Sequence, residues 1–204
     1  MSLAPDYVEL DALQATLSVE GALFLEADLR VAISAASRAV DKATYRSFGQ
    51  TEDAFAERFY TPVASSVLEI DDLLELTMVE LDLNGDGEFE TQLEANVDFY
   101  LEPLNALAKS EPYERLRLNR RRRPCWPRVP RSVRVMGQFG WPEVPPGVVE
   151  ATGILAARLV RRARETPYAI ATVGIETGTA LRIIRTDPDV AGLLDGLPRE
   201  VVLA

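Results

Sequence analysis

Residues 145–165, PPGVVEATGILAARLVRRARE, carry the clearest helical pattern in the chain. Apolar side chains recur every three or four positions, which places them along one face of a helix. Proline is favoured in the first turn of a helix, so the Pro-Pro-Gly sequence predicts where the helix begins. Arginines gather at the carboxyl end, where they complement the helix dipole. The apolar face consists of Val148, Thr152, Leu155 and Leu159, with Val149, Ala156 and Val160 beside it.

The same periodicity predicts three further helices. Residues 7–17 form a short amphipathic helix with Asp6 as its N-cap, and residues 26–45 form a longer one with Phe48-Gly49 after it as the stop signal. The middle of the longer helix is rich in alanine and serine, so another helix can approach it closely. A last short helix covers about residues 188–195, beginning after Asp187 and ending at Gly196.

The central part of the chain changes from a helical to an extended pattern. Residues 67–70 and 76–83 are rich in aliphatic and β-branched side chains, which favours strands. Asn84-Gly85-Asp86-Gly87 follows directly, and such a sequence between apolar stretches predicts a tight β-hairpin. Residues 88–101 are expected to return as a strand and then a loop, and Val133 and Val135 to form one more strand before a turn at 137–142.

Composition excludes several kinds of active site. The chain has 204 residues and no histidine, which removes Ser-His-Asp triads, Cys-His pairs and histidine-ligated metals. Its single cysteine, Cys125, cannot form an internal disulfide and is interpreted as an incidental thiol. No apolar run is long enough to span a membrane, and the N-terminus lacks the pattern of a signal peptide. We therefore expect a soluble, cytoplasmic protein that is not an enzyme and needs no cofactor.

Charge is strongly segregated along the chain, whose formal net charge is −10. Residues 115–134 contain nine arginines and no acidic residue, and we expect Arg115–Arg123 to form an extended loop or arm. Such a segment can dock on an acidic protein surface, including that of a neighbouring copy, or contact the phosphates of DNA. It can also be a merely solvated loop, and the sequence leaves these alternatives open.

The stretch Asp82-Leu83-Asn84-Gly85-Asp86-Gly87 matches positions 1, 3, 5 and 6 of an EF-hand calcium loop. Position 12 of that loop requires a bidentate glutamate, and Leu93 stands there in this chain. Because the flanking residues also have strand patterns, the hairpin is the better interpretation, and no metal site is expected.

Residues 139–165 resemble a signature of the head–tail connector (head-completion adaptor) proteins of tailed bacteriophages. The shared pattern is Gly-Trp, a short proline-containing turn, and a helix of the type Val-x-x-Ala-x-x-x-Leu-Ala-Ala-Arg-Leu. Other stretches resemble the same family in the same order. They are Asp6–Val8, Leu29–Asp41, Leu68–Leu73, Asp82–Thr91, Leu101–Ala106 and Arg185–Val190, followed by Leu193-Leu194.

The resemblance implies a mainly α (α+β) fold, in which a small helical bundle carries an inserted β-hairpin and strand region and a flexible C-terminal segment. One domain would cover residues 1–204. Its helical core would comprise about 6–48 and 143–196, its β-rich insertion about 65–137, and its C-terminal docking segment about 186–204.

The resemblance also implies a role and its partners. Family members form a ring of twelve beneath the portal protein, extend the DNA channel and join the capsid to the stopper or tail proteins. The chain would then contact portal, stopper or tail, neighbouring copies and the passing genomic DNA, but no membrane. It would reside at the head–tail interface of the virion after assembly in the host cytoplasm. The residues expected to contact portal, neighbour or DNA are Arg120, Arg121, Arg122, Arg123, Arg128, Trp141, Asp187, Leu193 and Leu194.

One alternative function remains from the residues themselves. The chain can be a nucleic-acid-binding accessory protein that uses the arm at Arg120–Arg123. It predicts salt-sensitive DNA binding that disappears when the four arginines are replaced by alanine.

Overall fold

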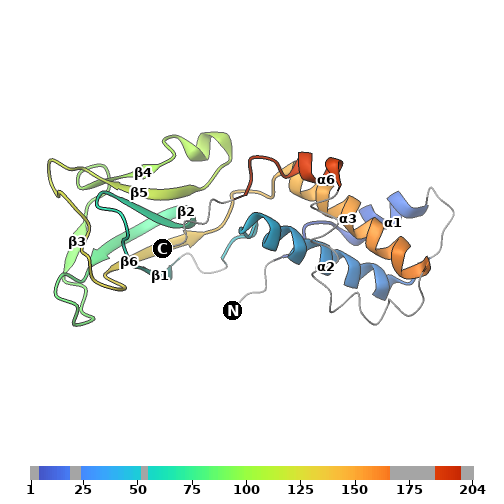
Figure 1. The fold of residues 1–204 in the computed structure, drawn as a ribbon, viewed down its shortest axis with the longest axis horizontal. Coiled ribbons are helices and arrows are strands. Elements are labelled where there is room, and N and C mark those ends of the chain that lie inside the picture. Colours follow the sequence, from blue (N-terminus) through green and yellow to red (C-terminus); the bar gives the residue numbers. More distant parts are fainter. Residues whose placement is uncertain (1–4, 19–23, 52–54, 166–186, 199–204) are drawn as a thin grey trace. The chain divides into compact units, whose positions relative to one another are not determined.

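The chain divides into two compact units, drawn in Figure 1 from a computed structural model. The structure describes residues 5–18, 24–51, 55–165 and 187–198. The helical unit comprises Ala4–Phe48 and Val144–Leu203, and the β-unit consists mainly of Gly49–Glu143. Arg185, Thr186 and everything after Pro198, which belong to the motif and the C-terminal segment predicted above, lie outside the described residues.

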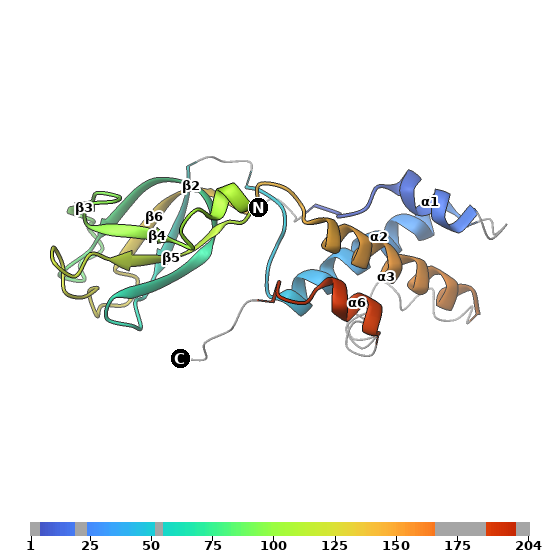
Figure 2. The same ribbon diagram turned by 90° about the horizontal axis from the view of Figure 1, so that it is seen from above.

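The helical unit contains four described helices. These are α1 (Leu10–Ser18), α2 (Glu26–Thr44), α3 (Pro146–Glu165) and α6 (Pro188–Leu193). Helix α3 packs against the other three, and Figure 2 shows α1 and α6 on either side of it. No helix in the described part of the chain is both long enough and apolar enough to cross a membrane.

Burial in the helical unit follows the apolar faces that the sequence predicts. Leu29, Ile33 and Val40 of α2 are at most 3% exposed, and so are Val148 and Leu155 of α3. Buried alanines on both helices leave room for close backbone approach, as expected from the composition of α2. They are Ala32, Ala36 and Ala39 in α2 and Ala151 and Ala156 in α3.

Helix α2 has the predicted bounds to within one residue, but Tyr45 ends it and not Phe48-Gly49. Tyr45 adopts a left-handed backbone conformation with φ of 55°, and its N–H donates to the carbonyl of Asp41. Phe48 then packs edge-on against Tyr7, with ring centroids 5.8 Å apart, and its N–H donates to the Tyr7 hydroxyl. Gly49, which was expected to end the helix, therefore follows a short connection in which Phe48 is buried.

The β-unit is built around one antiparallel sheet of six strands. The strands are β1 (Ala56–Tyr60), β2 (Val67–Leu81), β3 (Thr91–Leu93), β4 (Phe99–Glu102), β5 (Tyr113–Leu118) and β6 (Val133–Phe139). Their order is β1-β6-β2-β5-β4, and β3 pairs with the end of β2. A 3₁₀ turn, η1 (Ala106–Lys109), lies between β4 and β5. Every strand pair is antiparallel, which allows short connections.

The central strand β2 is 15 residues long and irregular. Its register against β5 and β6 shifts at three places, between Glu69 and Leu73, between Leu73 and Glu75, and between Leu76 and Met78. A bulge inserts a residue and so interrupts the alternation of buried and exposed positions. That interruption explains why the sequence predicts two short strands where the structure has one long strand.

The expected mainly α fold is wrong, because the chain is 34% helical and 26% strand. Three strands were missed for identifiable reasons. β1 is only five residues long, β4 lies where residues 88–101 were expected to end in a loop, and β5 lies where an arginine-rich loop was expected. In β5, Leu116 and Leu118 are buried while Arg115 and Arg117 are exposed, which is strand alternation with arginine at the outward positions. The predicted turn at 137–142 also begins too early, since β6 continues to Phe139.

Candidate interaction surfaces

The arginine-rich segment is divided between two strands and the loop that joins them. Arg117 of β5 pairs with Glu102 of the neighbouring strand β4. Arg134 of β6 pairs with Glu80 of β2, with 2.8 Å between its Nε and a carboxylate oxygen. The other arginines after β5 belong to residues 119–131, called here the arginine loop. Arg117 and Arg134 are thus matched to carboxylates of their own sheet.

Asn119 fixes the first half of the arginine loop. Its carbonyl accepts hydrogen bonds from the N–H groups of Arg122 and Arg123, at 2.8 and 3.0 Å. Its side-chain Nδ2 donates to the carbonyl of Val97 at 2.9 Å, and its N–H donates to that of Asp98 at 2.8 Å. The run of four arginines therefore forms a hydrogen-bonded turn attached to the sheet, and the extended arm expected from the sequence is not what the structure shows.

Trp126 fixes the second half of the loop. Its side chain is 1% exposed in the core of the β-unit, and its backbone N–H donates to the carbonyl of Ser65 at 2.8 Å. The adjacent Cys125 is exposed and free. An aromatic anchor on one side and an asparagine anchor on the other hold the intervening arginines in a defined place.

Most guanidinium groups of the arginine loop have no ionic partner within the described part of the chain. Arg122 alone of the run approaches a carboxylate, with its Nε 3.8 Å from Asp98. Arg131 lies over the ring of Phe59, 4.9 Å from its centroid. The remaining four have no carboxylate within 4.0 Å among the residues described, and they are Arg120, Arg121, Arg123 and Arg128. The loop thus presents a fixed, uncompensated positive surface.

The connection between β2 and β3, residues 82–90, is called here the acidic loop. The carboxylate of Asp82 accepts hydrogen bonds from the N–H groups of Gly85 at 2.6 Å and Gly87 at 2.9 Å. Both glycines have positive φ, which they adopt without a steric penalty. Desolvation alone would raise the pKa of Asp82, but these amide hydrogen bonds outweigh it and hold the pKa below its usual range.

The acidic loop joins two strands, so the hairpin predicted from Asn84–Gly87 is present, although its connection is longer than a tight turn. Leu93, at the twelfth position of the calcium-loop pattern, lies in β3 with 6% of its surface exposed. No group of three side chains able to hold a metal ion occurs among the described residues. The loop leaves three exposed carboxylates that pair with no arginine or lysine of the described chain, those of Asp86, Glu88 and Glu90.

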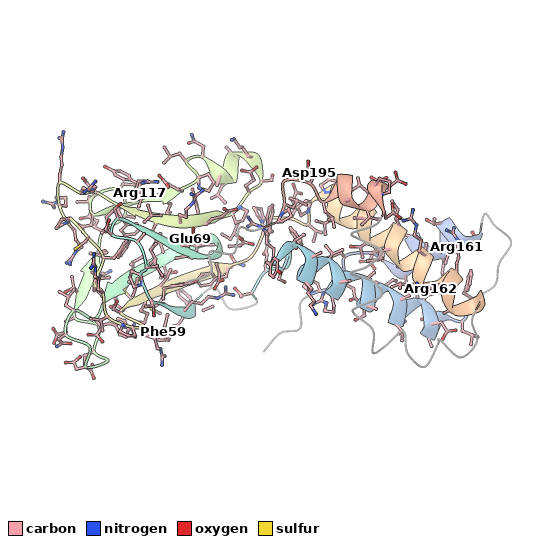
Figure 3. All side chains as sticks on the ribbon, viewed as in Figure 1. Phe59, Glu69, Arg117, Arg161, Arg162 and Asp195 are labelled. Atoms are coloured by element: carbon pink, nitrogen blue, oxygen red, sulfur yellow. The ribbon has the colours of Figure 1, made fainter. Side chains whose placement is uncertain are left out.

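Aromatic and charged side chains also cover the outer face of the sheet at β1 and β6. Phe59 is 38% exposed and packs against Phe89 of the acidic loop at 5.7 Å. The guanidinium of Arg134 lies 4.6 Å from the centroid of Phe89. Figure 3 shows Phe59 on the β-unit together with Glu69 and Arg117, which lie on the neighbouring strands β2 and β5.

Trp141, predicted to contact a partner, is 5% exposed within the chain. Its Nε1 donates a 2.9 Å hydrogen bond to the buried carboxylate of Asp72. Gly140 before it has a φ of +125°, and a Cβ there would lie 2.0 Å from the carbonyl oxygen of Gly49. The Gly-Trp pair therefore has a structural role in the β-unit, and a contact of Trp141 with a partner stays a prediction.

The predicted contact residues near the C-terminus belong to α6. Asp187 caps this helix, because its side chain accepts a hydrogen bond from the N–H of Val190, and it pairs with Arg158 of α3. Leu193 is half-buried and Leu194 is 4% exposed. These side chains attach α6 to α3, and their role in binding the portal also stays a prediction.

An apolar groove of about 460 Å³ lies between α1 and α3 in the helical unit. Val8 and Ala12 line it from one side, Val149 and Ile154 from the other. Arg161 lines its end, and Figure 3 shows this arginine beside Arg162 on the last turns of α3. The groove is a second candidate surface for a partner.

No protein-family model matches the sequence, and no curated protein matches it. Among solved structures, the chain is similar to one described as the neck of an empty GTA particle computed with C6 symmetry, where GTA denotes a gene transfer agent. The likeness has a TM-score of 0.51 and 18% sequence identity, and it covers 79% of this chain and 82% of that one. At this identity the comparison establishes a shared fold.

Sequence reasoning missed the acidic loop as a surface. Residues 82–87 were interpreted as a hairpin turn, with a fragment of an EF-hand loop as the alternative. The signal was present, because an aspartate followed by glycines three and five positions later can cap their N–H groups and fix the loop. The structure brings Asp82 and the two glycines together and leaves the later carboxylates exposed.

Proposed function

We propose that this chain is a structural subunit of the neck of a tailed, phage-like particle, and that it acts as a head–tail connector. The observation that carries the proposal is the fold shared with a chain from the neck of a gene transfer agent particle, over about four-fifths of both chains. The motifs at residues 139–165 and elsewhere in the sequence, found independently of that fold, resemble the same class of protein.

In the proposed role, copies of the chain form a ring beneath the portal, extend the DNA channel and join the capsid to the stopper or tail proteins. A closed ring requires two different surfaces on each copy, which meet head to tail. The fixed arginine loop and the exposed acidic loop are two such surfaces on one unit. The excess of acidic residues in the whole chain suits a channel through which DNA moves without adhering.

We propose a structural and not a catalytic role. The chain has no histidine, and its perturbed side chains have structural explanations. Burial raises the pKa of Tyr7, whose hydroxyl donates to Asp41, and burial likewise raises that of Tyr60, whose hydroxyl donates to Asp71. Each tyrosine joins segments within its own unit, Tyr7 in the helical unit and Tyr60 in the β-unit. Such internal bonds suit a subunit whose role is structural.

Electron microscopy of particles produced with this gene disrupted tests the proposal. We expect DNA-filled or leaking heads without tails, beside complete separate tails, and restoration of tailed particles by the intact gene in trans. Normal tailed particles in the absence of the gene would refute it.

A further inference from the structure

We infer that the arginine loop of one copy docks on the acidic loop of a second copy of this chain. The inference rests on the proposed ring-forming function and assigns the residues that make its subunit contact. The contacting side chains are Arg120, Arg121, Arg123 and Arg128 on one copy and Asp86, Glu88 and Glu90 on the other.

The arginine side of the contact is already positioned in the single chain. Hydrogen bonds to Asn119 and the buried ring of Trp126 hold the loop, so little conformational entropy is lost when it binds. Its four guanidinium groups have no carboxylate within 4.0 Å among the described residues. Arginine also suits this purpose because its planar donors bind a carboxylate in bidentate geometry.

The acidic side is fixed by its own hydrogen bonds. Asp82 holds Gly85 and Gly87, and Asn84 Nδ2 donates to the carboxylate of Asp86 at 2.8 Å. The other oxygen of Asp86 accepts from the N–H of Glu88, also at 2.8 Å. Exposed Leu83 adds apolar surface to the same loop, with half of its surface accessible.

The two loops are neighbours in one chain, yet they do not neutralise each other. A Cβ at Gly85 would lie 3.1 Å from a methyl carbon of Val129 in the arginine loop. The N–H of Asp82 donates to the carbonyl of Ser132, which directly follows that loop. Despite this proximity, no ion pair joins the exposed charges of the two loops, because each loop is held by its own anchors. Both sets of charges therefore stay available to another molecule.

The arrangement favours a second copy over DNA as the partner. A duplex carries one negative charge per about 1.7 Å of its axis. It would meet the acidic loop at the same end of the β-unit where it meets the arginines, as Figure 1 shows for the two segments beside β3. A compact acidic surface can meet the arginines without covering the acidic loop of the same chain, and the acidic loop of a second copy is such a surface.

Cysteine cross-linking in assembled particles tests the contact directly, since Cys125 is exposed within the arginine loop. Asp86→Cys, Glu88→Cys and Glu90→Cys, each made alone, place a second thiol in the acidic loop. Under oxidation we expect a ladder of covalent multimers from at least one variant, because successive copies are joined head to tail. The ladder is expected to disappear when Cys125→Ser is added. Glu111→Cys, on an exposed residue in the connection between β4 and β5, is the matched control and should give no ladder.

Charge reversal gives an independent readout. Replacing the four arginines by glutamate is expected to lower the yield of tailed particles by about tenfold or more, and so is replacing the three acids by lysine. Both sets of changes in one chain restore complementarity and are expected to recover most of the yield. Recovery in the combined variant would not occur if either set merely prevented folding.

Several outcomes would overturn the inference. Tailed particles without any cross-linked ladder would leave the connector function standing and exclude this contact. A cross-linked dimer and nothing larger would indicate a reciprocal contact and exclude a head-to-tail one. Salt-sensitive binding of a DNA duplex by the purified protein, lost in the four-arginine variant and accompanied by no ladder, would assign the arginine loop to nucleic acid.

Discussion

The indole Nε1 of Trp141 donates a 2.9 Å hydrogen bond to the carboxylate of Asp72, and both side chains are buried. The bond joins the second residue after β6 to the central strand β2. The N–H of Gly140 also donates to the carbonyl of Asp72, at 2.8 Å. The Gly-Trp sequence thus holds the end of the sheet where the chain leaves the β-unit.

Removing that hydrogen bond is expected to destabilise the protein. Trp141→Phe takes away the donor and leaves a buried carboxylate with one partner fewer, so we expect the free energy of unfolding to fall by about 1–3 kcal/mol. Urea unfolding of Trp141→Phe, Asp72→Ala and the double variant measures this loss. The double-mutant cycle separates the bond from the loss of ring volume, and a coupling near zero would contradict this assignment.

Gly140→Ala tests the requirement for glycine in the same motif. The added Cβ would meet the Gly49 carbonyl oxygen at 2.0 Å, in a backbone conformation that alanine rarely adopts. We expect a loss of about 2 kcal/mol or more from strain and overlap. Gly192→Ala is the matched control, because its Cβ would meet nothing within 4 Å and it lies in a helix. There the same change should be neutral or slightly stabilising, as measured by thermal unfolding.

The helices could be predicted from the sequence because their apolar faces repeat without interruption. In α3 the residues from Val148 to Leu159 follow a single helical period, and the four on the predicted face are buried, whereas Val149 beside it is 38% exposed. Asp187 and Pro188 likewise mark the beginning of α6, where the structure has a side-chain cap. Such local signals depend only on residues close in the sequence. The observed helices therefore differ from the predicted ones mainly at their ends.

The sheet was underestimated because its signals depend on distant pairing. Glu69 to Met78 contain three register shifts that no local pattern reveals. Arg115 and Arg117 suggested an extended loop or arm, yet both lie in β5, where Arg117 pairs with Glu102 of the adjacent strand. The fixed conformation of the arginine loop also depends on a distant contact, because Asn119 donates to the carbonyl of Val97, 22 residues earlier in the chain.

Tyr7 joins the segment before α1 to α2 and to the residues that follow α2. Its hydroxyl donates to Asp41 and accepts from the N–H of Phe48 at 2.9 Å. Tyr7→Phe removes both bonds while keeping the ring, so we expect a loss of about 1–3 kcal/mol in chemical denaturation. Tyr45→Phe is the control, because its side chain is 64% exposed, and it should change stability by less than about 0.5 kcal/mol.

Asp82 should make stability depend on pH in the acid range. Its folded pKa is lowered, so the unfolded state binds more protons as the pH falls. Its contribution is fully present above the unfolded value of about 3.9 and is lost as the pH falls through the lower folded value. Urea unfolding of wild type and Asp82→Asn should therefore differ at pH 7 and converge in strong acid. A difference that widened on acidification would contradict this sign, and Glu111→Gln, which alters an exposed carboxylate, serves as the control.

Asn119→Ala separates the placement of the arginine loop from its charge. The variant keeps every arginine but loses the Nδ2 bond to Val97 and the Oδ1 bond from the N–H of Arg121. We expect hydrogen exchange in residues 119–131 to accelerate by about tenfold, because the loop opens locally, while α3 keeps its protection. If the loop contacts a neighbouring copy through preorganised charges, the same variant should also assemble into particles less efficiently. Unchanged exchange in the loop would show that Trp126 alone holds it, whereas faster exchange with undiminished assembly would show that the contact needs the charges but not their fixed positions.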